Sequence, residues 1–189
     1  YDLACDTLIL APGHSARDTF AMLRDQGVAM EPKAFALGVR IEHDQAAISQ
    51  AQYGPAWEVL PAADYKLACH LPGGRGVFSF CVCPGGQVVC SSSEEGTVVT
   101  NGMSHRARDG ANINGGLLVG VDPADFAGSG PLAGFDFQRR WEALAYDLGG
   151  GGFAAPGQNV KTFLSGETPS LEGPLSPTYR PGVRPAALE

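Results

Sequence analysis

The stretch that decides the fold runs from residue 77 to residue 90 and reads VFSFCVCPGGQVVC. Two short apolar runs, 77–83 and 87–90, lie on either side of Pro84-Gly85-Gly86, which is typical of two strands joined by a turn. Similar apolar runs at 65–71 and 97–100 are bounded by further turn residues. We therefore predict a meander of short antiparallel strands over residues 65–100.

The sequence on both sides of this meander adds two strands and two helices. Residues 35–42 alternate in their second half between apolar and polar side chains, which indicates a strand with one face in water, and residues 117–121 form another apolar run. Helical patterns cover about 44–53 and 135–148. The predicted fold class is α+β, with a mainly antiparallel sheet and two or three helices, and the number of strands would allow the sheet to close like a barrel.

The pattern of the first 27 residues predicts a strand followed by a helix, which is half of a βαβ unit. Residues 8–11 form an apolar run typical of a buried parallel strand, Pro12-Gly13 ends it, and a helix follows with Ser15 as its N-cap and Gly27 as its stop. A parallel strand needs neighbours that this chain does not supply. We therefore expect an excised segment of a longer polypeptide, in which residues 1–27 are the βα remnant of a Rossmann-like domain and residues 28–148 are the main domain. Residues 149–189, rich in Gly and Pro, are expected to be a tail that packs on that domain or returns towards the first.

Charge and hydropathy argue against two classes of partner. The chain has 20 acidic and 13 basic residues and a net charge of −7, which is the wrong sign for a nucleic-acid backbone or an anionic membrane surface. No apolar run approaches the roughly 18–20 residues that span a bilayer. We expect no nucleic-acid partner and no membrane partner.

The five cysteines favour reduced thiols in a cytoplasmic protein, because their number is odd and the chain is too long to need disulfides. A zinc site at Cys81, Cys83 and Cys90 is the alternative, but the C-x-C spacing suits it poorly, since residues two apart in a regular strand are about 6.6 Å apart. We expect no metal site. A two-residue turn would place Cys81 opposite Cys90, whereas a three-residue turn would place Phe80 there, so the pairing stays open.

The most polar segment covers residues 101–114 and reads NGMSHRARDGANIN. An ordered loop of this composition suits an anionic or amide-like small molecule, because Arg offers a forked cation and Asn offers a donor and an acceptor together. The alternative is a loop whose Asn and Asp side chains bond their own backbone. The candidate substrate-binding residues are Asn101, Ser104, Arg108, Asn112 and Asn114.

A second candidate motif is Gly13-His14-Ser15, which follows a predicted strand and precedes a predicted helix. This is the position of the nucleophile elbow G-x-S-x-G, but Arg17 stands where the second glycine is needed. We favour Ser15 as a helix N-cap and keep a serine esterase as an alternative.

Several blocks together resemble the bacterial family of FAD-dependent dehydrogenases, which is related to the NAD(FAD)-utilising dehydrogenases. The blocks occur in the family's order and include LAPGHSARDTF (10–20), GVRIEH (38–43), FCVCPGG (80–86), NGMS (101–104), RDGANIN (108–114) and PTYRPGV (177–183). The family pattern has small residues such as Ser-Ala where this chain has Gly115-Gly116, which we expect to loosen a loop there.

The resemblance implies a middle-to-late segment of an FAD-dependent oxidoreductase, with residues 1–27 in the FAD-binding domain and residues 28–148 as its substrate domain. It implies FAD in the parent protein, with Gly13 and His14 as flavin contacts, a small-molecule substrate and NAD(P)H as a candidate electron donor. The partner of this segment is then the remainder of the same polypeptide.

Because the glycine-rich fingerprint G-x-G-x-x-G is absent from these residues, we expect the segment alone to bind no FAD and to be inactive. The alternative from another class is a stand-alone module that binds a small ligand through residues 101–114.

Overall fold

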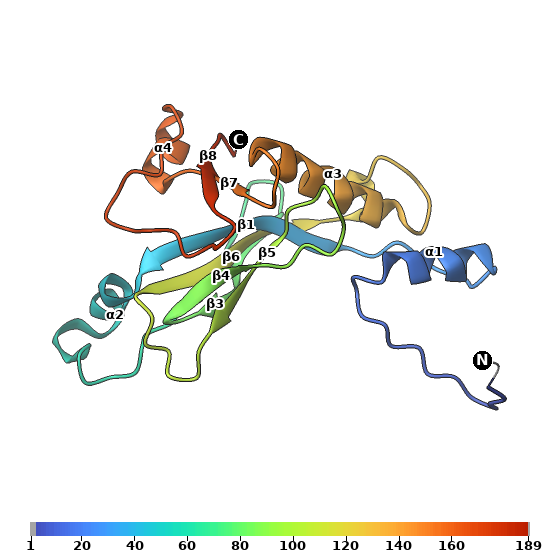
Figure 1. The fold of residues 1–189 in the computed structure, drawn as a ribbon, viewed down its shortest axis with the longest axis horizontal. Helices are drawn as coiled ribbons and strands as arrows, with labels where there is room; N and C mark the ends of the chain where they lie inside the picture. Colours follow the sequence, from blue (N-terminus) through green and yellow to red (C-terminus); the bar gives the residue numbers. More distant parts are fainter. Residues whose placement is uncertain (1–2, 189) are drawn as a thin grey trace.

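The computed structural model describes residues 3–188 and has an α+β fold (Figure 1). Its four α-helices are α1 Arg17–Asp25, α2 Gln45–Tyr53, α3 Ala133–Leu148 and α4 Val160–Ser165. Its strands are β1 Phe35–Asp44, β2 Ala68–His70, β3 Gly76–Cys83, β4 Gly86–Cys90, β5 Thr100–Ser104, β6 Asn112–Val121, β7 Ala155–Gly157 and β8 Val183–Pro185. The predicted fold class is confirmed, and α4 is a helix in the tail that the sequence patterns did not indicate.

The main sheet has the strand order β1-β6-β3-β2 and is antiparallel throughout. Strand β6 lies at its centre and pairs with β1 from Phe35↔Val121 to Asp44↔Asn112. The sheet is open, with β1 and β2 at its edges, so the barrel-like closure is wrong. Gly115 and Gly116 lie within β6, and the expectation that they loosen a loop is therefore also wrong.

The turn at residues 84–85 takes the chain from the main sheet into a second sheet, in which β4 pairs with β5. The meander therefore predicts the pairing of β2 with β3 correctly, whereas the pairing it predicts between β3 and β4 is wrong. Strand β4 pairs with β5 instead, in the register Cys90↔Thr100, although β2 covers β3 only from Gly76 to Phe78. Consequently neither Cys81 nor Phe80 pairs with Cys90.

The core lies between the second sheet, α3 and the tail. It consists of Val88, Val98, Ala155 and Tyr179, with Ala145, Tyr146 and Val183 packed against them. Tyr179 fastens the tail, because its ring is buried and its hydroxyl donates to the carbonyl of Phe153 at 2.9 Å. The other aromatic residues of the tail, Phe153 and Phe163, are exposed.

The N-terminal segment forms no strand within the described residues. Leu8, Ile9 and Leu10 are exposed, and Ile9 retains 87% of its accessible surface. Figure 1 shows this segment running away from the sheets before α1. Helix α1 begins one residue later than predicted, with Ala16 at the N-cap position and no side-chain cap, so Ser15 is not the cap. The helices within residues 3–188 are all too short or too polar to span a bilayer.

Candidate functional site

The strongest candidate site lies on the face of the main sheet that the second sheet covers. Residues paired across neighbouring antiparallel strands point to the same face, so each row of paired residues places three side chains side by side. Two such rows cross β1, β6 and β3, and they are Arg40–Gly116–Phe80 and Glu42–Asn114–Cys83. Arg40 reaches along this face to Asn114, which lies two residues from Gly116 in β6.

The Arg40 guanidinium joins three strands. Its Nη1 donates to Asn114 Oδ1 at 2.5 Å and to the carbonyl of Cys81 at 3.1 Å, and its Nη2 lies 3.4 Å from Asn101 Oδ1. We call Arg40, Cys81, Asn101, Gly102 and Asn114 the Arg40 cluster. The fork of the guanidinium is thus fixed by acceptors from β3, β5 and β6, which a lysine ammonium could not match.

Gly102 allows β5 to approach this guanidinium. A Cβ atom at this position would overlap both Arg40 Nη1 and Asn114 Oδ1. The backbone N–H of Gly102 donates to Asn101 Oδ1 at 2.8 Å, which orients the Asn101 side chain. Glycine is therefore required at residue 102 for the cluster to close.

Asn114 carries a hydrogen-bond donor that nothing satisfies within the described residues. Its side chain is fully buried, its Oδ1 accepts from Arg40, and its Nδ2 has no partner. Buried amide groups are rarely left unpaired, because the desolvation of such a group costs about 1–3 kcal/mol. The arrangement suits an added group that carries a hydrogen-bond acceptor or a negative charge.

The opposite face of the main sheet holds His43 and Tyr65, whose rings meet edge to face with centroids 5.4 Å apart. Burial lowers the pKa of His43, so its imidazole is neutral near pH 7. Burial raises the pKa of Tyr65, although the positive charge of Arg40 opposes the rise. The Tyr65 hydroxyl is buried without a hydrogen-bond partner among residues 3–188, and a Cβ at Gly115 would lie 2.8 Å from it.

The predicted binding loop is largely strand. Asn101 and Ser104 lie in β5 and Asn112 and Asn114 lie in β6, so only residues 105–111 connect the two strands. The segment is therefore not the continuous loop expected from its polarity. Two of the predicted binding residues, Asn101 and Asn114, lie together because both contact Arg40.

Two other predicted residues serve local structure in this conformation. The Ser104 hydroxyl donates to the carbonyl of Pro84 at 2.8 Å. The Asn112 amide donates to Glu42 Oε1 at 3.2 Å and to the carbonyl of Ser176 at 3.0 Å. Glu42 in turn accepts from the backbone N–H and the hydroxyl of Thr178, so Asn112 and Glu42 hold the tail beside the Arg40 cluster.

Arg108 lies in the connection between β5 and β6 and is exposed. Its backbone adopts a left-handed conformation with φ +53°, and its main chain packs against Gly85, where an added Cβ would overlap the Arg108 carbonyl. The guanidinium makes no hydrogen bond to any residue of the described range 3–188, so it is available to solvent or a ligand.

Gly13 and His14 lie apart from the Arg40 cluster, in the exposed segment that leads into α1. Ser15 Oγ lies 3.4 Å from His14 Nε2, and within residues 3–188 no carboxylate accepts a hydrogen bond from this histidine. With no strand before it and no acid to orient the base, Gly13-His14-Ser15 lacks the geometry of a nucleophile elbow in this structure.

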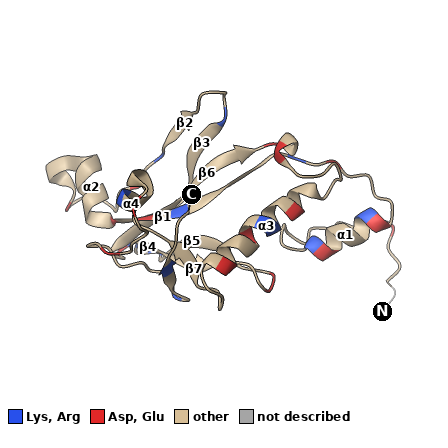
Figure 2. Ribbon diagram, turned by 90° about the horizontal axis from the view of Figure 1, so that it is seen from above, with Lys and Arg blue, Asp and Glu red and all other residues tan. Residues whose placement is uncertain are grey.

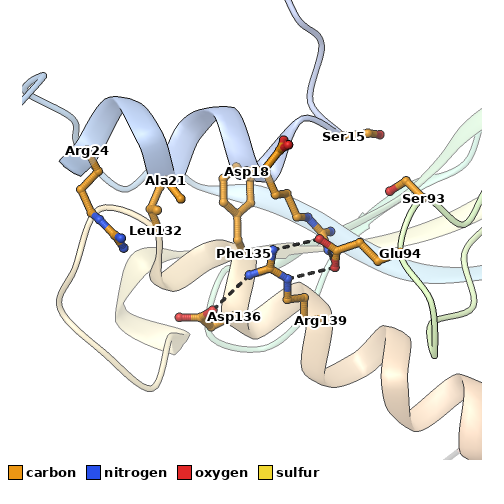
Figure 3. Close-up of a pocket in the computed structure, with 11 residues that line it drawn as sticks. Ser15, Asp18, Ala21, Arg24, Ser93, Glu94, Leu132, Phe135, Asp136 and Arg139 are labelled. Carbon is orange, nitrogen blue, oxygen red and sulfur yellow. Dashed lines mark hydrogen bonds and ion pairs between the residues drawn. The ribbon is translucent and has the colours of Figure 1, made fainter. Parts of the chain in front are cut away.

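A pocket of about 350 Å³ lies beside Ser15, between α1, α3 and the Ser93-Glu94 segment (Figure 3). Its charged groups neutralise one another. Arg17 is buried and donates to Glu94 at 3.0 Å and to Glu142 at 2.7 Å, while Arg139 donates to both carboxylate oxygens of Glu94. Figure 2 shows that α1 and α3 each carry both basic and acidic residues.

Hydrogen bonds from Arg139, with the added charge and hydrogen bond of Arg17, hold the pKa of Glu94 at about 2 despite partial burial. We assign this pocket to the docking of α1 on α3, because every one of these ion pairs joins α1, α3 or the Ser93-Glu94 segment to another.

The sequence patterns did not nominate Arg40 or Glu42. The alternation Val39-Arg40-Ile41-Glu42 was the available signal, but it is equally typical of a solvent-exposed strand face. Only the second sheet and the tail, which cover that face, turn these charges inward. Within residues 3–188, no group of three His, Cys, Asp or Glu residues lies together as a metal site would require.

Comparison with known proteins supplies the family. Residues 34–189 match the family described as FAD-dependent protein, C-terminal domain-like. The chain is also 50% identical over 184 residues to a protein of Clostridium beijerinckii that carries the name "Uncharacterized protein". This match covers 96% of the chain but only 34% of the relative, so the chain spans about a third of the length of that relative. The chain therefore belongs to the family of FAD-dependent proteins and corresponds to their C-terminal-domain-like part.

Proposed function

We propose that this chain is the substrate-facing domain of an FAD-dependent oxidoreductase of the dehydrogenase type, and that the Arg40 cluster is its binding site. The observation that carries the proposal is the buried Asn114 amide without an acceptor, beside a guanidinium held in a fixed orientation. In this proposal the chain is a segment of a longer flavoprotein, which we call the parent polypeptide.

The residues present fit part of a flavin site and not all of it. Asn114 Nδ2, Arg40 and the exposed Asn101 amide offer donors to a carbonyl oxygen or an anion. A dinucleotide also needs a glycine-rich turn at a helix N-terminus for its pyrophosphate, and the sequence has no G-x-G-x-x-G. The parent polypeptide must therefore hold most of the cofactor, and FAD when bound supplies hydride or electron transfer.

The residues of this chain then bind and orient. Arg40 presents a cation whose direction is fixed by Asn114 and the Cys81 carbonyl, and Asn101 adds an amide at the exposed side. Arg108 adds a second, exposed cation from the connection between β5 and β6. Together they favour a small substrate that carries a carboxylate or a carbonyl group, and the flavin contacts of Gly13 and His14 remain a prediction that rests on the family resemblance.

The exposed apolar segment supports the need for further chain. Leu8 and Ile9 are almost fully exposed, and such a run is stable as a strand only when neighbouring strands cover it. In the parent polypeptide we expect residues 8–11 to join the sheet of the FAD-binding domain.

The test is an Arg40→Met substitution in the parent polypeptide. We expect the variant to retain FAD, to fold, and to show an altered flavin absorption spectrum together with slower reduction of the flavin by NADH or NADPH, or by dithionite if neither reacts. Arg75→Met is the matched control, because Arg75 pairs with Asp125 at the far side of the β2–β3 hairpin. Equal spectra and equal rates for the two variants would contradict a binding role for Arg40.

The same buried amide supports a second candidate, a stand-alone small-ligand module. It predicts that the isolated chain is stabilised by a small carboxylate, because a ligand that binds only the folded state raises the unfolding temperature. A screen of dicarboxylates against the chain and its Asn114→Leu variant separates the two proposals. Stabilisation of the unsubstituted chain alone would favour the module.

A further inference from the structure

Strand β3 carries a β-bulge that separates two cysteines. Phe80 pairs with Gly116 and Cys83 pairs with Asn114, so residues 81 and 82 together oppose one residue of β6. Cys81 takes up the extra length with φ +47°, a left-handed conformation that residues with a Cβ seldom adopt. Strained backbone of this kind is concentrated at functional sites, and the surrounding structure must hold it in place.

The bulge brings the two thiols into one environment. Cys83 is buried, and its Sγ donates to the Cys81 carbonyl at 3.4 Å. Cys81 is exposed, and its Sγ donates to Asn101 Oδ1 at 3.9 Å. Burial raises the pKa of the Cys83 thiol, the Cys81 thiol raises it further, and Arg40 opposes both effects.

The argument from a regular strand, in which Cys81 and Cys83 are too far apart, therefore does not apply here. A bulge bends its strand, and Cys81 departs from the extended conformation on which that distance rests. A disulfide between residues two apart would still be strained, and strained disulfides are the readily exchanged ones. Such a pair suits the transfer of electrons and not the permanent bracing of the fold.

We propose that Cys81 and Cys83 form a redox pair that exchanges with a small-molecule disulfide. The Cys81 thiolate attacks one sulfur of R–S–S–R, so that a Cys81–S–S–R bond forms, the R–S–S–R bond breaks, and the first thiolate leaves with the proton from Cys81. The Cys83 thiolate then attacks Cys81 Sγ, so that the Cys81–Cys83 bond forms and the second thiolate leaves with the proton from Cys83. The dithiol loses two electrons, and the small-molecule disulfide becomes two thiols.

Exposure assigns the two roles. Cys81 is exposed to solvent and is the attacking residue, whereas Cys83 is buried and resolves the mixed disulfide. Cys5, Cys69 and Cys90 are also exposed, but no other cysteine lies within two residues of them. They can form adducts but have no resolving partner along the chain. The proposal requires no flavin and is independent of the proposed function.

The experiment exposes the chain to oxidised glutathione, quenches the reaction with acid, alkylates the remaining thiols and maps the peptides by mass spectrometry. We expect one internal disulfide at residues 81–83, the loss of both alkylatable thiols from the peptide that holds Cys81 and Cys83, and full recovery with dithiothreitol. Stable glutathione adducts on Cys81, or an unchanged Cys81–Cys83 peptide, would overturn the proposal.

Two variants and one control test the roles of the cysteines. Cys83→Ala should trap a glutathione adduct on Cys81, and Cys81→Ser should leave Cys83 reduced. Cys69→Ser, which removes an exposed thiol from β2, should behave like the unsubstituted chain. An internal disulfide that survives in Cys81→Ser, or a Cys81 adduct that forms no faster than the one on Cys69, would contradict the assignment. The mapping of the unsubstituted chain decides the matter even if a variant fails to fold.

Discussion

At the scale of single residues, the Arg40 cluster depends on an absent side chain as much as on the ones present. Arg40 donates to Asn114, and β5 closes over the guanidinium because residue 102 is glycine. Replacing Gly102 therefore tests the cluster without removing any of its polar groups.

We predict that Gly102→Ala destabilises the chain by about 1–3 kcal/mol, because the added methyl overlaps Arg40 and Asn114 and forces one of them to move. Urea unfolding measures the change. Gly120→Ala is the matched control in β6, where the nearest atom to an added Cβ is the Gly76 carbonyl oxygen at 3.9 Å. Equal stability of the two variants would mean that the cluster is not packed as described.

The composition of the polar segment nominated two residues of this cluster. Asn101 and Asn114 were predicted to bind a ligand because Asn offers a donor and an acceptor together, and the structure brings both to Arg40, while their role in binding stays a prediction. Arg40 itself was not predictable, since a charge that alternates with apolar residues in a strand normally faces water. Its burial depends on the second sheet, which no local pattern announces.

At the scale of elements, two attachments hold the periphery to the sheets. The first is the docking of the tail, in which Glu42 of β1 accepts from the N–H and hydroxyl of Thr178, and the Thr178 hydroxyl accepts from the N–H of Val88. The second is the docking of α1 through Arg17.

For the tail, we predict that Glu42→Gln weakens its attachment by about 1–3 kcal/mol, because the amide group has one acceptor oxygen where the carboxylate has two. Hydrogen exchange at the Thr178 and Val88 amides should become faster while the main sheet stays protected. Glu172→Gln, at an exposed residue of the same tail, should leave both amides unchanged. Uniformly faster exchange over the whole chain would show that Glu42 supports the fold and not this attachment.

For the docking of α1, the low pKa of Glu94 predicts that the stability of the chain depends on pH. The folded pKa of about 2 lies below the ordinary value of 4.5, so the stabilisation is fully present above about pH 4.5 and is lost as the pH falls towards 2. The free energies of unfolding of the chain and of its Glu94→Gln variant, measured with urea at pH 6 and at pH 3, should differ less at pH 3. A difference that does not change with pH would contradict the ion-pair network.

The existence of most elements was predictable, and their pairing was less so. The patterns for residues 35–42, 44–53 and 135–148 correspond to β1, α2 and α3. The turn at Pro84-Gly85-Gly86 also exists, but a turn of this composition serves a hairpin and a change of sheet equally well. Here it changes the sheet, because β4 pairs with β5, a strand that follows later in the chain.

At the scale of the whole molecule, the N-terminal segment differs most from its prediction. Residues 8–11 were predicted as a buried strand and are exposed here, because a strand is stable only beside a partner and none lies within residues 3–188. The strand at residues 8–11 of a longer polypeptide stays a prediction, because no pattern can show where a neighbouring strand lies.

If residues 8–11 are exposed in the isolated chain and buried in the parent polypeptide, one substitution should have two different effects. Ile9→Asp should change the stability of the isolated chain by less than about 0.5 kcal/mol, as is usual for exposed positions. In the parent polypeptide the same change should be strongly destabilising, because it would bury a charge in the sheet. Thermal unfolding of both proteins measures this, and a neutral effect in the parent polypeptide would contradict the burial of residues 8–11.

The most direct test of the account is the visible absorption spectrum of the purified parent polypeptide, recorded beside that of this chain after both have been incubated with FAD and desalted. The account predicts a bound-flavin spectrum for the parent polypeptide and no absorption above that of the protein for the chain. A parent polypeptide that stays colourless after incubation with FAD would contradict it.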